Sequence, residues 1–490
     1  MATMTGKFGK DVVIRFITEG LLRVRALIFL PIIAKFLGVD DYAIWTQVGI
    51  TLSLLTPLLM LRLESACVRY LGSVEDREEL GRRFFSMFAL ILGILLLVCA
   101  TLYSLSEEVS LLLFGEREYD LIARLFSIYL FATVTRTFLQ NYYRTVNRTK
   151  TYSWIQMVQS FSEIGLIAFF ILYIGTGIEG AFYAVILVNV VVAGAVLADV
   201  IRELGLRFDL RGGALGNYIR FSLPLIPAGA LYWLINLSDR YVILYFLGLD
   251  ELGRYSAAYN LSGTLVFFLS PISFVLFPMA SQLWEGREYS RVKSLLSRST
   301  GFFLILSIPA AAGLTYLSPK LLSILATDAF VTSQMLMALL SLGYVFFGVR
   351  EILGVILTLK EKTYLSPIIL GGVAVFNVVA NILVVPEYGI TGAALTTLAS
   401  YLVLMLAYLY LARIYFPITI EPVRIMKSVG ATALMMAPLL IIDPSGLVMI
   451  VLATVLSAGI YFGTMFIIGG IGKRELDMLR EVMRPQSTSR

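Results

Sequence analysis

The chain has 490 residues, of which 58% are hydrophobic and 15% are charged, and its mean hydropathy is +0.85. Soluble domains are about half apolar and about a quarter charged, so this composition excludes a chain built mainly of soluble domains and indicates an integral membrane protein. The chain has no histidine, which excludes histidine-ligated metal sites and histidine proton relays. Its two cysteines are too few for a disulfide framework.

Apolar runs long enough to cross a bilayer follow one another along the chain. A transmembrane helix needs about 20 mostly apolar residues, and these runs lack the alternation of barrel strands. The sequence therefore predicts an all-α polytopic membrane protein with about 14 transmembrane helices. They are expected at 11–37, 42–63, 84–104, 120–142, 152–174, 178–201, 219–247, 252–280, 299–317, 331–358, 364–385, 390–412, 424–442 and 446–469.

Lysine and arginine concentrate in alternate loops. The loops near Arg148 and Arg291 are basic, whereas the intervening loops near Glu108 and Asp250 are acidic. Short cytoplasmic loops of membrane proteins carry an excess of basic residues. This bias predicts a multi-pass protein of the cytoplasmic membrane with both termini in the cytoplasm. It also accounts for the net charge of +6 without a nucleic-acid partner.

Three short motifs recur in the same order, about 210 residues apart. The segment 36–41 (FLGVDD) returns as 246–251 (FLGLDE), 150–152 (KTY) as 362–364, and 177–181 (GIEGA) as 389–393 (GITGA). Collinear matches at equivalent places indicate an internal repeat. Six helices per repeat give two halves with the same orientation. We predict an N-lobe at 1–210, a C-lobe at 211–415, two appended helices at 416–470 and a cytoplasmic tail at 471–490.

The first predicted helix carries an unusual set of charges, Arg15, Glu19, Arg23 and Arg25. Charged side chains at a helix centre cost about 2.5–3.5 kcal/mol each on insertion scales, so they are expected to face a hydrated cavity or one another. Arg15, Glu19 and Arg23 follow a four-residue spacing and form one polar stripe, whereas Arg25 lies off it. The alternative is an amphipathic interfacial helix with snorkelling arginines.

Further charges lie within predicted helices: Arg136, Glu163, Asp239, Arg240, Arg350 and Glu351. Sequence neighbours do not face each other on a helix, so we expect Asp239 and Arg240 to have different partners. That pair can serve either neutralisation between helices or substrate contact. Glu163 is either an ion-coupling carboxylate or the partner of Arg136. Arginine outnumbers carboxylate at the deep positions of the N-lobe, which suits an anionic substrate, because guanidinium matches phosphate.

The segments 221–227 (FSLPLIP) and 238–244 (SDRYVIL), followed by Gly253-Arg254-Tyr255-Ser256, resemble the central signature of the oligosaccharide flippases. These Wzx-type polysaccharide transporters belong to the superfamily of MATE exporters and lipid II flippases. The basic first helix and the arrangement of six, six and two helices resemble the same family over essentially the whole chain.

The resemblance implies a flippase, not an enzyme, that moves polyprenyl-diphosphate-linked oligosaccharide across the cytoplasmic membrane for polysaccharide biosynthesis. It implies no bound cofactor, leaves coupling to Na⁺, H⁺ or the membrane potential open, and makes glycan biosynthesis enzymes candidate partners. The headgroup site carried over comprises Arg15, Arg23, Asp239 and Arg240, and more weakly Glu19, Arg25, Arg136, Arg350 and Glu351. The alternatives are a MATE-like exporter of cations or drugs and, less favoured, a membrane-embedded glycan polymerase or glycosyltransferase.

Overall fold

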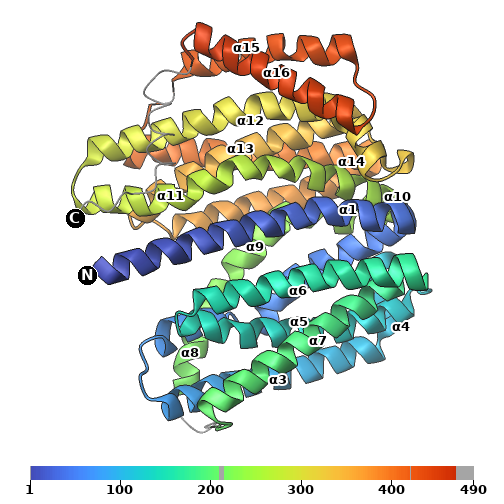
Figure 1. Cartoon of the computed structure of the whole chain (residues 1–490), viewed down its shortest axis with the longest axis vertical. Helices are drawn as coiled ribbons and strands as arrows, with labels where there is room; N and C mark the ends of the chain where they lie inside the picture. The colour runs from blue at the N-terminus through green and yellow to red at the C-terminus, as the bar shows by residue number, and fades with distance from the viewer. Residues whose placement is uncertain (1, 209–213, 420, 471–490) are drawn as a thin grey trace. The chain divides into compact units, whose positions relative to one another are not determined.

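The computed structural model describes the backbone of residues 2–208, 214–419 and 421–470, and the side chains of residues 31–208, 215–419 and 421–470. Helices account for nearly all of this part of the chain (Figure 1). The α-helices are α1 (Ala2–Leu59), α2 (Leu63–Ala66), α3 (Arg77–Ser104), α4 (Ser106–Phe114), α5 (Asp120–Thr145), α6 (Thr149–Phe169), α7 (Gly177–Leu204), α8 (Ala214–Ser222), α9 (Ile226–Leu237), α10 (Asp239–Ser262), α11 (Val266–Glu285), α12 (Tyr289–Leu325), α13 (Gln334–Leu359), α14 (Leu365–Tyr415), α15 (Pro422–Ile442) and α16 (Leu447–Ile467).

Short 3₁₀ and π segments join or extend some of these helices. The π segments are η1 (Cys67–Leu71) and η2 (Phe170–Ile174), and the 3₁₀ segments are η3 (Leu223–Leu225), η4 (Gly263–Leu265) and η5 (Asp328–Phe330). The prediction of an all-α polytopic protein is confirmed. Two differences concern detail. The predicted helix 219–247 is interrupted, because Pro224 and Pro227 begin η3 and α9. The predicted loop 105–119 contains α4, whose nine residues are too few to cross a bilayer.

Three long helices contain a glycine that breaks them. Gly38 in α1 has φ 86° and ψ −174°, Gly248 in α10 has φ 84° and ψ −174°, and Gly389 in α14 has φ 59° and ψ −149°. This backbone region is essentially restricted to glycine. Eleven stretches of the described residues are long and apolar enough to cross a membrane, and three of them contain such a glycine. Because α1 begins well before Gly38, dividing α1 and the other two stretches at their glycines gives a number of helices roughly consistent with the predicted 14.

The same glycines support the internal repeat. Gly38 and Gly248 come from one repeated motif and have nearly identical backbone angles. Gly177, the counterpart of Gly389, has φ 62°. In the repeated motif 177–181 and 389–393, Gly180 and Gly392 are also equivalent. A Cβ on either would clash with the residue four positions earlier, Thr176 or Tyr388. The two halves therefore share backbone conformation and close packing at these positions, as well as sequence.

The chain packs as two compact units, Met1–Ser256 and Ala257–Arg490. The lobe boundaries predicted from the repeat remain a prediction. In the first unit, a large core of aliphatic and aromatic side chains joins α1, α3, α5 and α7, with Phe84 stacked on Phe138 at 5.2 Å between ring centroids.

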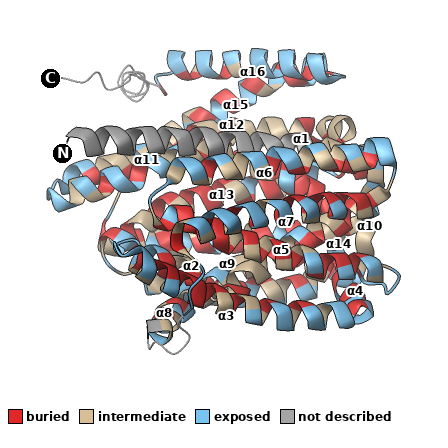
Figure 2. Ribbon diagram, turned by 60° about the horizontal axis from the view of Figure 1, so that its bottom comes forward, coloured by how far each residue is buried: buried red, intermediate tan, exposed pale blue. Residues whose placement is uncertain are grey.

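In the second unit, α15 and α16 pack on α12 (Figure 1). Ile305 of α12 shares a core cluster with Met435 of α15 and Tyr461 of α16. Most of α16 is exposed (Figure 2). Its exposed large apolar residues include Val448, Val455 and Ile467. An apolar exposed face of this kind is expected where lipid is the solvent.

Candidate functional site

The charged stripe of the first predicted helix lies outside the residues whose side chains the structure describes. Arg15, Glu19, Arg23 and Arg25 therefore remain predictions. The other predicted site residues are described, and they lie in three polar clusters. Arg136, Asp239 and Arg240 belong to the first compact unit, and Arg350 and Glu351 to the second.

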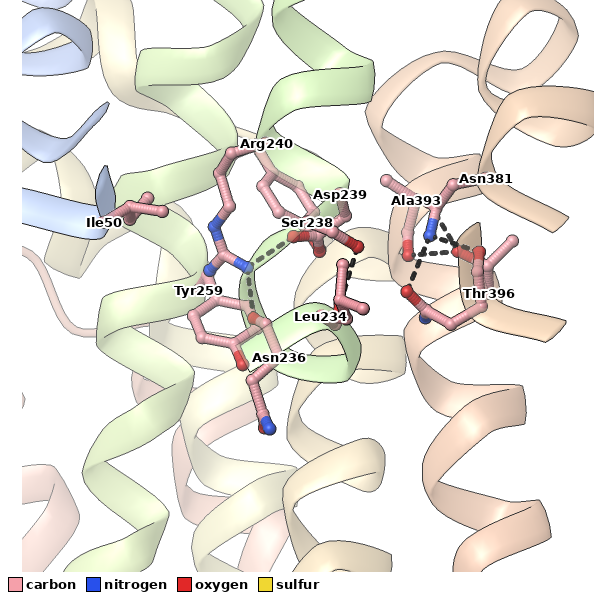
Figure 3. A network of polar contacts seen from close by, with 12 residues as sticks. Ile50, Leu234, Asn236, Ser238, Asp239, Arg240, Tyr259, Asn381, Ala393 and Thr396 are labelled. Atoms are coloured by element: carbon pink, nitrogen blue, oxygen red, sulfur yellow. Dashed lines mark hydrogen bonds and ion pairs between the residues drawn. The ribbon is translucent and has the colours of Figure 1, made fainter. Parts of the chain in front are cut away.

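Asp239 and Arg240 form a fully buried ion pair at the start of α10 (Figure 3). Arg240 Nη1 lies 2.6 Å from Asp239 Oδ1, and the two side chains are 2% and 1% exposed, respectively. Arg240 also donates to the carbonyl oxygen of Asn236 at 2.6 Å, and the hydroxyl of Tyr255 donates to Asp239 Oδ2 at 2.5 Å. The guanidinium lies 5.2 Å from the centre of the Tyr255 ring. Both carboxylate oxygens are thus compensated within the first unit.

This geometry corrects the expectation that Asp239 and Arg240 have different partners. The helix is interrupted at Ser238, between α9 and α10, so Asp239 is the first residue of a new helix. The long arginine side chain turns back from there towards the preceding turn. Arg350 and Glu351 also pair with each other, in the middle of α13.

Arg136 and Glu163 are joined through an amide. Arg136 Nε donates to Asn189 Oδ1 at 2.6 Å, and Asn189 Nδ2 donates to Glu163 Oε1 at 2.9 Å. Gln140 accepts from Arg136 Nη1 at 2.5 Å, and Gln159 donates to Glu163 at 2.9 Å. This network connects α5, α6 and α7 in the first unit. It supports the structural role weighed for Glu163, with Asn189 as the bridge.

Arg350 and Glu351 occupy a less buried position. Their side chains are 11% and 32% exposed. Arg350 Nη2 donates to the hydroxyl of Tyr408 at 3.2 Å, which in turn donates to Ser366 at 3.0 Å. The guanidinium lies 4.7 Å from the centre of the Tyr408 ring.

Sequence reasoning missed the uncharged members of these clusters. Asn189 interrupts the apolar run of α7, and an amide within such a run is a signal that could have identified it. A second missed cluster lies within α14, where Thr396 donates to Asn381 at 2.8 Å and Asn377 donates to Ser400 at 2.9 Å. Figure 3 shows Asn381 with Ala393 and Thr396.

A polar contact joins the two sequence repeats within the first unit. Trp233 Nε1 of α9 lies 3.1 Å from both the carbonyl oxygen of Ile50 and the hydroxyl of Ser53 in α1. The hydroxyls of Thr51 and Tyr241 are 2.6 Å apart. The rings of Trp233 and Tyr241 lie 5.8 Å apart. These side chains hold the second predicted helix against the seventh.

The family follows from comparison with known proteins. The model of the polysaccharide biosynthesis protein family matches residues 8–284, more than half of the chain. The chain belongs to this family. A second model, MatE, matches residues 224–383. The resemblance to the oligosaccharide flippases and to the superfamily that contains MATE exporters is thereby confirmed.

Two archaeal relatives match part of the chain. A membrane protein of Methanocaldococcus jannaschii, named as uncharacterized, is 30% identical over 178 residues, which is 36% of this chain and 35% of the relative. The probable low-salt glycan biosynthesis flippase Agl15 of Haloferax volcanii is 25% identical over 191 residues, which is 39% of this chain and 40% of the relative. The chain thus spans less than half the length of these relatives.

The fold is shared with a solved lipid II flippase. The structure of MurJ in its inward closed conformation matches with a TM-score of 0.74 and 14% sequence identity. The match covers 96% of this chain and 99% of the MurJ chain. At this identity the likeness establishes the fold alone. The expectation that the chain is not an enzyme agrees with the family match and with the relative named as a flippase.

Proposed function

We propose that this protein is a flippase of the cytoplasmic membrane that moves polyprenyl-diphosphate-linked oligosaccharide between leaflets by alternating access. The observation that carries the proposal is the family match combined with a fold that follows a lipid II flippase over nearly the whole chain. The relative named as a glycan biosynthesis flippase supports the same substrate class. Glycan biosynthesis enzymes would supply the substrate on the cytoplasmic side.

The charge compensation among the described residues favours particular arginines for the diphosphate. Arg136, Arg240 and Arg350 each have polar or acidic partners within their own unit. A compensated guanidinium must exchange partners to bind a phosphate, which lowers its affinity. We therefore assign the diphosphate to Arg15 and Arg23 of the polar stripe. Glu19, Arg25, Arg136, Asp239, Arg240, Arg350 and Glu351 are secondary candidates that shape the potential around the headgroup.

Alternating access requires contacts between the repeats that can break. The hydrogen bonds of Trp233 with Ile50 and Ser53, and of Tyr241 with Thr51, are contacts of this kind. We propose that they part as the protein changes the side to which its cavity opens. The oligosaccharide headgroup then crosses while the lipid tail stays in the bilayer. Coupling to Na⁺, H⁺ or the membrane potential is compatible with this scheme.

Complementation of a strain that lacks its own flippase tests the assignment of the stripe. Arg23→Ala should abolish surface glycan while the amount of protein in the membrane is unchanged. Arg23→Lys should restore partial export, because it keeps the charge and loses the bidentate fork. Lys35→Ala removes an exposed cation from the same helix and is the matched control. Full export by an Arg15→Ala, Arg23→Ala double variant would refute the assignment and favour the interfacial helix.

A MATE-like exporter is the second candidate, because the MatE model matches residues 224–383. Expression in a drug-sensitive strain distinguishes the two. Raised resistance to organic cations without restored glycan would support the exporter, and the converse would support the flippase.

A further inference from the structure

A pocket in the second unit lies between α12 and α15, away from the clusters described above. Its lining is Ser297, Arg298, Gly301, Leu304, Ile305, Thr419, Glu421, Arg424, Ile425 and Ser428. Two guanidiniums and three hydroxyls thus line the same pocket as three aliphatic side chains. Neither the family match nor the relatives assign a ligand to it.

The two arginines come from different helices and flank the pocket. Arg298 is exposed and makes no hydrogen bond or ion pair within the described part of the chain. The Arg424 side chain extends towards α12, so that its Cδ lies 4.0 Å from the position of a Cβ on Gly301. Glu421 lies 3.3 Å from Arg424 Nε but is 67% exposed. One carboxylate against two guanidiniums leaves the lining positive.

The position of the pocket along the predicted spans matches the headgroup region of a bilayer. The apolar spans predicted at 299–317 and 424–442 begin beside Arg298 and at Arg424, so both arginines lie at a membrane boundary. Leu304 and Ile305 are about 9 Å further along α12 at the rise of an α-helix. The polar part of the pocket is therefore at headgroup level, and its apolar part is at the level of the acyl chains.

The inner end of the pocket is closed by fixed hydrogen bonds. The hydroxyl of Tyr461 in α16 lies 2.7 Å from that of Ser428 and donates to the carbonyl oxygen of Ile305 at 2.7 Å. These contacts tie α12, α15 and α16 together. The lining residues Ile305 and Ser428 are therefore fixed in position by the packing of three helices.

Two further lysines lie near Phe416, which comes just before α15 in the chain. The Phe416 ring has the ammonium groups of Lys293 and Lys360 at 5.3 and 5.8 Å from its centre. Lys293 stands on α12, five residues before Arg298, and Phe416 comes three residues before Thr419 of the pocket. The charge bias of the loops predicts that this end of the helices is cytoplasmic. Basic pockets between helices on that side suit anionic lipid headgroups.

We propose that this pocket binds an anionic phospholipid of the surrounding leaflet. The phosphate lies between Arg298 and Arg424, the hydroxyls of Ser297 and Thr419 contact the headgroup, and the acyl chains stay in the bilayer beside the half-buried Ile425. The lipid thereby links α15 and α16 to α12. The site goes beyond the proposed transport function and does not depend on which substrate is moved.

Native mass spectrometry of the purified full-length chain tests the site. The probe is an equimolar mixture of phosphatidylglycerol and phosphatidylcholine in detergent. The wild type should retain phosphatidylglycerol preferentially. An Arg298→Gln, Arg424→Gln double variant should lower that preference about thirtyfold, since each of the two basic residues attracts an anionic lipid by about 1 kcal/mol and about 1.4 kcal/mol corresponds to a factor of ten. Millimolar inorganic phosphate should not displace the lipid, because the acyl contacts are lost in the free ion.

A second variant keeps both arginines and fills the pocket. Gly301→Leu adds a side chain where the nearest neighbour is the flexible Arg424, and it raises helix propensity, so folding should be retained. It should lower phosphatidylglycerol retention as the double variant does. Arg291→Gln is the matched control, because Arg291 is on the same helix, is 71% exposed and pairs with Glu288. Unchanged retention in both pocket variants, an equal loss in the control, or full displacement by inorganic phosphate would overturn the site.

Discussion

Two ion pairs of this protein have the same local design and different surroundings. Asp239–Arg240 and Arg350–Glu351 each join sequence neighbours, and each places a guanidinium about 5 Å from a tyrosine ring (5.2 Å from Tyr255 and 4.7 Å from Tyr408). The first pair is almost completely buried, whereas about a third of the Glu351 side chain is exposed. From this difference we expect burial, not the pairing itself, to determine how much each charge depends on its partner.

The largest effect is expected from Asp239→Asn, which leaves the Arg240 charge buried without its counter-ion. Breaking a buried pair in this way costs about 3–5 kcal/mol. Denaturant unfolding in detergent should show the loss. The double variant Asp239→Leu, Arg240→Met should recover most of it, because both charges are removed together. A single variant as stable as the wild type would show that water reaches this pair.

Asn189→Leu extends the comparison to charges that are joined through an amide. The substitution removes the bridge between Arg136 and Glu163 and leaves two buried polar groups less well satisfied. Each of the two groups keeps another partner, Gln140 or Gln159, so the total loss should be about 1–3 kcal/mol and lie between those of the two ion pairs. The same unfolding measurement checks the order. If Asn189→Leu is neutral, Arg136 and Glu163 must compensate each other by another route.

Glu351→Gln should cost about 1 kcal/mol or less, because solvent screens a pair that is partly exposed. It is measured in parallel with Asp239→Asn under identical conditions. Equal losses for the two variants would contradict the role assigned to burial.

Much of the fold follows from the sequence because bilayer thickness fixes the length of each apolar run. The motifs around Gly38 and Gly248 also predicted where helices break, since glycine is needed for their backbone angles. The partners of the charges could not be predicted in the same way. They depend on tertiary contacts such as that of Tyr255 with Asp239 and on a helix interruption at Ser238, which hydropathy does not detect.

The smallest effect is expected at the surface, where Asp443 meets Lys320 of α12. Hydrogen bonds from Lys320 and Tyr316 hold the pKa of Asp443 below its ordinary value of 3.8. Its contribution is therefore complete above that value and is lost as the pH falls through the lower pKa of the folded state. Asp443→Asn should lower the thermal midpoint slightly at pH 7 and leave it unchanged in strong acid. A difference that grows on acidification would contradict this sign.

Transport by the purified protein tests the proposed function most directly. The full-length chain is reconstituted in liposomes that contain a fluorescent polyprenyl-diphosphate oligosaccharide, and a membrane-impermeant reagent reports how much of the headgroup lies in the outer leaflet. The account predicts that the wild type makes the whole pool accessible, and that an Arg15→Ala, Arg23→Ala variant leaves the inner-leaflet half protected. Protection of that half by the correctly folded wild type, under every ion gradient and membrane potential applied, would contradict it.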